Sequence, residues 1–140
     1  MMKVITNYIE LSTNGKFDIV DITDKVHQNL RLTLLREGNV TIFNPGSTAG
    51  ISTMEFDTTL IADFQRMCER LIPEKGEYEH DKKWHDGNGH AHLRSSFLRT
   101  SLPIPFRQSK LLLGNMQQIV FIEFDNRPRQ RKVITQFIGM

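Results

Sequence analysis

The sequence lacks the features that most directly assign a protein to a class. Its only cysteine, Cys68, cannot form an internal disulfide, which is typical of a reducing compartment. No apolar run approaches the roughly 20 residues of a membrane-spanning helix, and the opening MMKVITNYIELS lacks the apolar core of a signal peptide. The net charge of +2 is too small to argue for nucleic acid. These absences predict a cytoplasmic protein without a membrane segment, and they give no support for a nucleic-acid partner.

The composition is that of one ordinary folded domain. With 140 residues, of which 39% are hydrophobic and 24% are charged, the chain can bury a core without disulfide bonds. It contains no internal repeat and no low-complexity linker. We therefore expect a single domain over residues 1–140.

The hydrophobic pattern predicts an α+β fold built mainly from antiparallel sheet. Three segments have helical spacing, and the other apolar segments alternate or form short runs. The expected helices are residues 21–35, with Thr23 or Asp24 as the N-cap, 58–71 and 91–98. The expected strands are an opening hairpin of 3–11 and 17–20, then 40–43, 51–56, 102–106, 110–113, 117–124 and 131–138. Residues 117–124 are apolar on both faces, which is typical of a central strand.

Four of the five histidines lie between residues 78 and 92, where the chain reads YEHDKKWHDGNGHAH. They are His80, His85, His90 and His92. Neutral imidazole is the commonest metal ligand among side chains, and its pKa near neutrality also suits it to proton transfer. The segment is therefore the first candidate for a metal site or a catalytic centre. The alternative is that some of these histidines are solvated loop residues.

The spacing of His90 and His92 constrains how they could share a metal. They lie on one face of an extended segment, but on a helix residues two apart point about 200° apart. His80 lies far enough upstream to return through the glycine-containing loop. Glu123 on the apolar strand is the best carboxylate candidate, because a buried carboxylate needs a partner or a cation. Mixed histidine and carboxylate ligands suit zinc or a similar divalent metal.

Two other segments have the composition of anion sites. The loop of residues 45–50 is rich in hydroxyl and backbone N–H groups that can cradle an anion, although it lacks the lysine of a nucleotide-binding P-loop. The alternative is a plain connection between strands. A second group, Arg127, Arg129, Arg131 and Lys132, crowds the last turn. These side chains either recognise a phosphate or carboxylate group or form a solvated basic hairpin.

The order of several motifs resembles the YjbQ-type family. The motifs are GSTAGI, YEHD, DGNGHAH, QQIVFIEFD and RPRQR, and the resemblance runs from about Val4 to Gly139. It implies a compact α+β fold with a β-sandwich-like core, assembly as a homotrimer, and a weak secondary thiamine-phosphate synthase activity. The family's two motif histidines match His80 and His92, and its late-strand glutamate matches Glu123.

One departure from the family pattern lies in the loop. Many members have a histidine where this chain has Gly46, and our hypothesis is that His90 replaces it, completing a site with His80 and His92. The candidates then form three sets. The expected catalytic residues are His80, His90, His92 and Glu123; the expected metal ligands are His80, His90 and His92; the expected anion-binding residues are Ser47, Thr48, Ala49, Asn88, Arg94 and Ser96.

These residues support two hypotheses of different kinds. The first is an enzyme that acts on a small anionic or phosphorylated substrate, with the histidines holding a divalent metal or transferring protons. The second is a non-catalytic trimeric module that binds a metal or an anion. An open position beside the serine–threonine loop favours the enzyme, whereas a site closed by protein groups favours the module.

Overall fold

A computed structural model describes all residues from Met1 to Met140 and contains eight strands and four helices. The strands are β1 (Lys3–Thr13), β2 (Asp18–Asp21), β3 (Glu37–Phe43), β4 (Ala49–Met54), β5 (Ser101–Arg107), β6 (Lys110–Leu111), β7 (Gln118–Glu123) and β8 (Arg129–Gly139). The helices are α1 (Thr23–Thr33), α2 (Thr58–Leu71), α3 (Glu79–Trp84) and α4 (Gly89–Leu98). None of the four helices has the length and apolar character that a membrane crossing requires.

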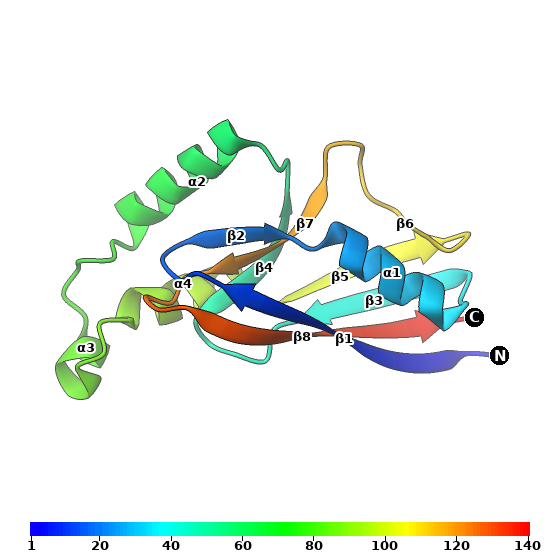
Figure 1. The fold of residues 1–140 in the computed structure, drawn as a ribbon, viewed down its shortest axis with the longest axis horizontal. Helices are drawn as coiled ribbons and strands as arrows, with labels where there is room; N and C mark the ends of the chain where they lie inside the picture. The colour runs from blue at the N-terminus through cyan, green and yellow to red at the C-terminus, as the bar shows by residue number, and fades with distance from the viewer.

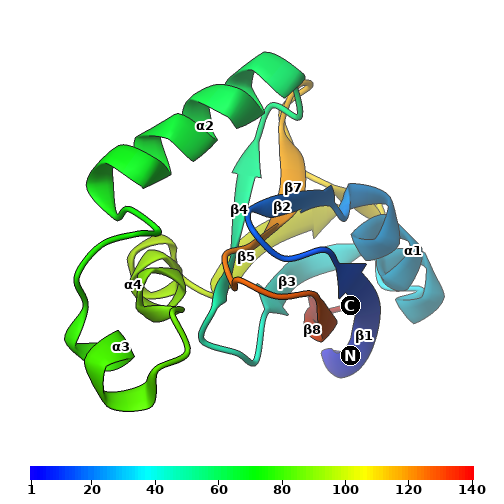
Figure 2. The ribbon, with the colours of Figure 1, turned by 60° about the vertical axis from the view of Figure 1, so that its left-hand side comes forward.

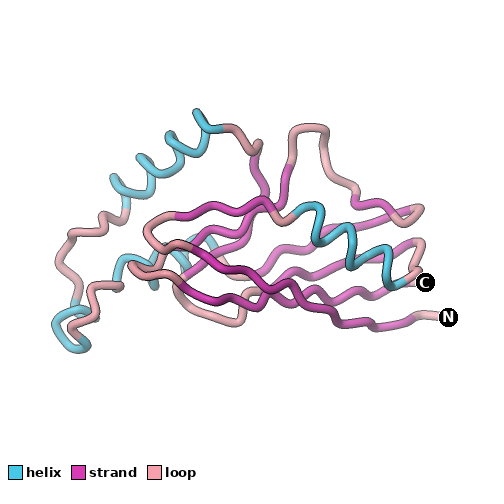
Figure 3. The backbone as a smooth tube through the Cα atoms, in the orientation of Figure 1, coloured by secondary structure: helices cyan, strands magenta, loops and turns pink.

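The strands form two antiparallel sheets. The larger sheet has the order β1-β8-β3-β5-β6, and the smaller sheet has the order β2-β7-β4. Figure 1 shows α1 near both chain termini, while α2, α3 and α4 gather at the opposite end of the molecule. The same arrangement is visible in the backbone trace (Figure 3). The prediction of an α+β fold with mostly antiparallel sheet is confirmed.

The central strand β7 leads from the main core to Glu123, one of the candidate site residues. It is buried from Ile119 to Glu123, and its two neighbours in the smaller sheet are β2 and β4. One face contributes Ile119 and Phe121 to the main core, which both sheets and α1 share. The opposite face packs against α2 and α4. Because side chains alternate along a strand, Glu123 lies on the face of Phe121 and points toward the larger sheet.

The opening hairpin predicted from the sequence is wrong. β1 pairs with β8 over its full length, from Lys3 opposite Gly139 to Thr13 opposite Arg129, and β2 pairs with β7 in the other sheet. The eleven residues of β1 form a much longer ladder with β8 than the four residues of β2 could provide. The turn between β1 and β2 therefore crosses from one sheet to the other.

The basic segment after β7 is also a crossover and not a hairpin. β7 belongs to the smaller sheet and β8 to the larger one. The crossover places Arg129 and Arg131, at the start of β8, next to the end of β7. Two strands that never pair thus bring their charged residues together between the sheets.

α1 begins two residues later than expected, and neither Thr23 nor Asp24 is its N-cap. The cap residue is Ile22, whose side chain makes no capping hydrogen bond. The carboxylate of Asp21 accepts hydrogen bonds from the backbone N–H of Thr23 at 3.0 Å and from its hydroxyl at 2.6 Å. The Thr23 hydroxyl in turn accepts from the N–H of Ile119 at 2.9 Å. Thr23 therefore attaches the start of α1 to β7.

α2 has the expected apolar stripe, but the rest of the protein covers little of it. Cys68 is the only buried residue of the helix, which confirms the prediction of a core thiol. Met67 and Leu71 remain 44% and 63% exposed. Figure 2 shows α2 on the same side of the molecule as α3 and α4.

The histidine segment is more helical than predicted. Residues expected to form a loop contain α3, and α4 begins at Gly89, two residues before the expected start. Because α4 includes both His90 and His92, the two imidazoles project from different sides of one helix. This local structure decides which histidines can meet.

Candidate functional site

A polar cavity of about 410 Å³ lies where the β3–β4 loop approaches the start of β8. Residues 44–48 line one side, residues 129–132 line another, and Asn88 and His92 complete the wall. None of the lining side chains is a large apolar group. The cavity therefore combines the predicted anion loop, the basic segment and one histidine.

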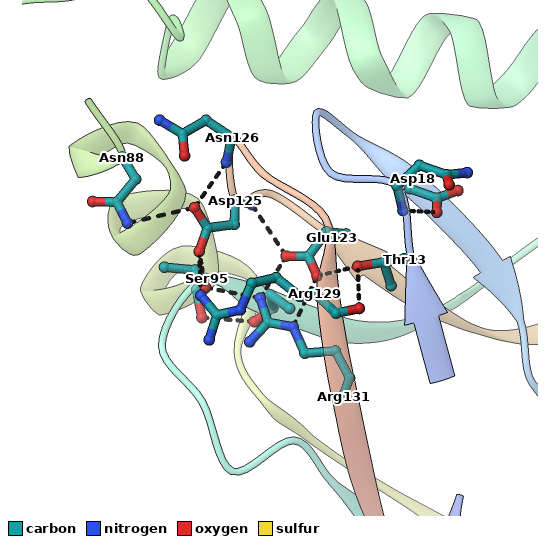
Figure 4. Close-up of polar contacts among 12 residues, drawn as sticks. Thr13, Asp18, Asn88, Ser95, Glu123, Asp125, Asn126, Arg129 and Arg131 are labelled. Atoms are coloured by element: carbon teal, nitrogen blue, oxygen red, sulfur yellow. Dashed lines mark hydrogen bonds and ion pairs between the residues drawn. The ribbon is translucent and has the colours of Figure 1, made fainter. Parts of the chain in front are cut away.

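Arg131, a lining residue, is held in place by Glu123. Arg131 Nε donates a hydrogen bond to Glu123 Oε1 at 2.8 Å, and Nη2 donates to Oε2. The same carboxylate accepts from the Thr13 hydroxyl at 2.7 Å and from the Asp125 N–H at 3.1 Å (Figure 4). Each oxygen of Glu123 thus has protein donors, and the buried pair is electrically neutral.

A second ion pair lies beside the first. Arg129 Nη1 donates to Asp125 Oδ2 at 2.6 Å. The Thr48 hydroxyl donates to the same oxygen at 3.1 Å and accepts from Arg131 Nη2 at 2.8 Å. Burial raises the pKa of Asp125, but the hydrogen bonds from Asn126, Thr48 and Asn88, together with the positive charge of Arg129, outweigh it and hold this pKa below its usual value. Thr48 therefore ties the loop to both ion pairs.

Glu123, one of the expected catalytic residues, has no surface in the cavity. It is fully buried and is absent from the lining, because the alternation of β7 directs it toward β8. Its carboxylate is fully engaged by Arg131 and its neighbours. In this geometry Glu123 contacts Arg131 and lies outside the cavity lining.

Two of the candidate histidines meet at the cavity. His92 lines it, and the ring centroids of His80 and His92 are 4.5 Å apart. His80 Nδ1 lies 3.3 Å from Asp81 Oδ1 and 3.5 Å from Asp86 Oδ1. Ligand atoms of His80, Asp81 and Asp86 all lie within 4.8 Å of one another. The structure thus brings together a histidine pair and two carboxylates.

His90 does not join this group. It is 2% exposed, its Nδ1 has no hydrogen-bond partner, and it is not part of the cavity lining. The helical backbone of α4 separates it from His92. Burial lowers the pKa of His90, and the nearby positive charge of Arg94 lowers it further. The three-histidine set expected from the sequence therefore does not converge on one point.

The six expected anion-binding residues divide equally. Ser47, Thr48 and Asn88 line the cavity, whereas Ala49, Arg94 and Ser96 do not. The backbone N–H groups of Ser47 and Thr48 donate to no group of the protein.

The three that lie elsewhere have separate explanations. Ala49 is completely buried as the first residue of β4. Arg94 donates to the carbonyl oxygen of Ile72 at 2.9 Å and to Glu69 at 3.0 Å, so it links α4 to the end of α2. Ser96 lines a separate polar hollow on the other side of the loop.

The structure adds residues that the expected sets omitted. Asn44 is buried against the cavity with an unpaired Nδ2, and Arg129 and Arg131 reach the site from β8. The spacing of the two arginines was the available signal, because alternate residues of a strand share a face. No local pattern distinguishes Asn44, since its place depends on how the loop meets β8.

Comparison with known proteins identifies the family of this chain. The family model described as "UPF0047 protein YjbQ-like" matches residues 7–140. The chain belongs to this family. A UPF0047 protein of Archaeoglobus fulgidus is 36% identical over 91% of this chain and 97% of the relative. The UPF0047 protein YugU of Bacillus subtilis is 32% identical over 94% of this chain and 97% of the relative.

Solved structures of UPF0047 proteins share the fold. A YbjQ-like protein of unknown function from Sulfolobus solfataricus P2 matches with a TM-score of 0.94 and 30% identity, over 100% of both chains. An uncharacterised protein of the YjbQ/UPF0047 family from Clostridium acetobutylicum matches with a TM-score of 0.86 and 32% identity, over 94% of this chain and 98% of that one. The YjbQ-like fold expected from the motifs is confirmed.

Proposed function

We propose that the cavity is the active site of a small-molecule enzyme that binds a phosphorylated, anionic substrate. The observation that supports this most strongly is that one cavity is lined by His92 and by Ser47 and Thr48, whose backbone N–H groups donate to no protein group. Backbone N–H groups and guanidinium groups suit oxyanions, and histidine is the commonest general acid or base. His92 is the group proposed to exchange a proton with the substrate.

The charge balance of the cavity limits the class of substrate. Arg129 and Arg131 are each paired with a buried carboxylate, so Lys132 is the lining cation without one. Directed N–H donors, and not a large positive charge, must then hold the ligand. This favours a phosphate ester over nucleic acid, whose binding requires many basic groups free to neutralise phosphates.

His80 and its carboxylates support the proposed role of His92. The ring of His80 packs on the ring of His92, while Asp81 and Asp86 approach its Nδ1. Asp81 Oδ1 also accepts from the N–H of Gly89 at 2.8 Å, which fixes this carboxylate at the start of α4. A carboxylate that is fixed in this way can orient the imidazole beside it.

The family resemblance supplies one reaction to test, the transfer of a pyrimidine-methyl group from its pyrophosphate to a thiazole phosphate. Formation of thiamine phosphate would be compared between the wild type, His92→Ala and His85→Asn. His85 has a left-handed φ of 56°, which asparagine tolerates, so this variant is a matched control. We expect His92→Ala to lose about a hundredfold or more in rate and His85→Asn to retain it. No product above background with the wild type would eliminate this reaction.

A non-catalytic anion-binding module is the alternative, and it shares the same cavity. Gly46 and Ser47 are exposed, so the cavity is open beside the loop, which favours the enzyme. Phosphate binding without turnover of phosphate esters or of the two thiamine precursors would favour the module.

A divalent cation is a second candidate ligand, with a donor set that differs from the expected one. His80, Asp81 and Asp86 offer one nitrogen and two carboxylate donors close together, which suits zinc or a similar ion. A cation held there would supply positive charge that a pyrophosphate requires and that the cavity itself lacks.

We also propose the homotrimer that the family resemblance implies. Large apolar side chains on α2 and α4 support it, since Leu71 is 63% and Phe97 is 74% exposed. Light scattering should give three times the mass of the 16.3 kDa chain. A monomer mass at micromolar concentration would contradict the trimer.

A further inference from the structure

Gly46 leaves an opening between two nitrogen donors in the cavity wall. A Cβ atom on this residue would lie 3.0 Å from Arg131 Nη1, 3.3 Å from Asn44 Nδ2 and 3.6 Å from the acceptor Asn44 Oδ1. The φ of Gly46 is not in the left-handed region, so its backbone conformation does not require glycine. What Gly46 contributes is therefore the space that a side chain would fill.

Both donors at this opening lack a partner within the protein. Asn44 is 2% exposed, and its Nδ2 makes no hydrogen bond. Arg131 directs Nε and Nη2 to Glu123 and Thr48, while its Nη1 donates to no protein group. Buried N–H groups are almost always paired, because leaving one unpaired is costly. An unpaired amide next to an unused guanidinium N–H indicates an acceptor that a ligand supplies.

The loop adds two more donors to the same wall. The backbone N–H groups of Ser47 and Thr48, which follow Gly46 directly, are also free of protein partners. Successive free N–H groups of this kind form cradles for anions, and a guanidinium donor strengthens the bond to an anionic oxygen. Glu123 lies behind Arg131 and outside the lining, so it does not repel the ligand from within the cavity.

We propose that the opening formed by Asn44, Gly46 and Arg131 is the subsite for one oxygen of a tetrahedral oxyanion, such as a phosphoryl group. This inference rests on the proposed function and adds a specificity determinant to it. A side chain at residue 46 would cover both nitrogen donors, so binding of the oxyanion at this subsite requires glycine at residue 46. A tetrahedral phosphate can engage the opening and the loop N–H groups together, whereas a planar carboxylate has only two oxygens to share among four donors.

The test is a titration of ¹⁵N-labelled protein with inorganic phosphate, with acetate in parallel. Gly46→Ala fills the opening, and Asn44→Asp replaces a donor by an acceptor. Gly114→Ala is the matched control, because a Cβ there would meet only the side chain of Gln117, at an ordinary 3.6 Å from Oε1 and 3.8 Å from Cβ. We expect phosphate to shift the side-chain amide of Asn44, and Gly46→Ala and Asn44→Asp to weaken phosphate at least tenfold. Gly114→Ala should bind phosphate like the wild type, and acetate should bind the wild type more weakly than phosphate does.

The outcomes separate this subsite from the proposed function. If the wild type binds phosphate and Gly46→Ala binds it equally well, the subsite is overturned while anion binding by the cavity stands. Saturable binding that leaves the Asn44 amide unshifted has the same meaning, and it decides the matter even if Asn44→Asp does not fold. A wild type that binds no phosphate overturns the subsite and the proposed function together.

Discussion

Arg131 on β8 and Glu123 on β7 form a two-point ion pair that joins the two sheets beside the cavity. The pair forms because the alternation of side chains along β7 directs Glu123 to the core face of its sheet, and the alternation along β8 does the same for Arg131. The cavity therefore has a guanidinium whose position is fixed from behind and whose remaining Nη1 is free. Such fixed donors bind an anion without being reorganised first.

Breaking this ion pair from one side should destabilise the fold strongly. Glu123→Gln leaves the Arg131 charge buried without its counter-charge, and Arg131→Met leaves the carboxylate alone. Each should lower the free energy of unfolding by about 3–5 kcal/mol. The double variant removes both charges and should lose clearly less than the sum, as measured by urea denaturation. Strictly additive losses would show that the two side chains do not act as a pair.

The Thr48 hydroxyl should matter more than its size suggests. Thr48→Val keeps the shape of the side chain but removes the link between Arg131 and Asp125. We expect a loss of about 1–3 kcal/mol in the free energy of unfolding, because buried partners are left unpaired. Thr41→Val, on an exposed position of β3, is the control and should change this energy by no more than about 0.5 kcal/mol. Equal effects of the two substitutions would refute the linking role.

His90 should make the free energy of unfolding decrease as the pH falls. Burial, with the nearby charge of Arg94, lowers the pKa of His90 in the folded protein below its ordinary value of 6.5. As the pH falls below that value, the unfolded chain binds a proton that the folded protein does not, so the free energy of unfolding falls. The slope contributed by one group is at most about 1.4 kcal/mol per pH unit.

His90→Gln removes the group and should flatten the curve of unfolding free energy between pH 7.5 and 5. Part of the slope should persist, because burial lowers the pKa of His27 as well. Chemical denaturation across this pH range measures the effect. A His90→Gln curve parallel to that of the wild type would contradict the burial of a neutral His90.

Metal binding should distinguish the observed cluster from the expected three-histidine set. Isothermal titration with Zn²⁺ and Mn²⁺, on protein without a histidine tag, should give at least about tenfold weaker binding for Asp86→Asn. His90→Ala should bind like the wild type, because His90 lies outside the cluster. If His90→Ala loses the metal and Asp86→Asn keeps it, the set His80, His90 and His92 is the correct one.

The spacing of apolar residues predicted those helices and strands whose own residues carry a clear period. The strand β7 could be predicted because its two faces are both apolar, and α2 because its apolar residues recur with helical spacing. The pairing of β1 with β8 could not, since the partners are separated by almost the whole chain. α3 could not be predicted either, because five of its six residues are polar and a single apolar residue, Trp84, gives no periodicity.

The site could be predicted only in part for the same reason. Motifs shared with the family identified His80 and His92, which do come together. The exclusion of His90 follows from the helical state of α4, which the spacing alone left open. The opening at Gly46 depends on Asn44 and Arg131, which lie in separate segments of the sequence and come together because β3 pairs with β8.

In the proposed function, a phosphorylated ligand binds against His92. The most direct measurement follows the imidazole signals of His92 during a titration with inorganic phosphate, with the exposed His85 as an internal reference. We expect a saturable shift of the His92 signals and no shift for His85. Saturable phosphate binding that leaves the His92 signals in place would contradict it.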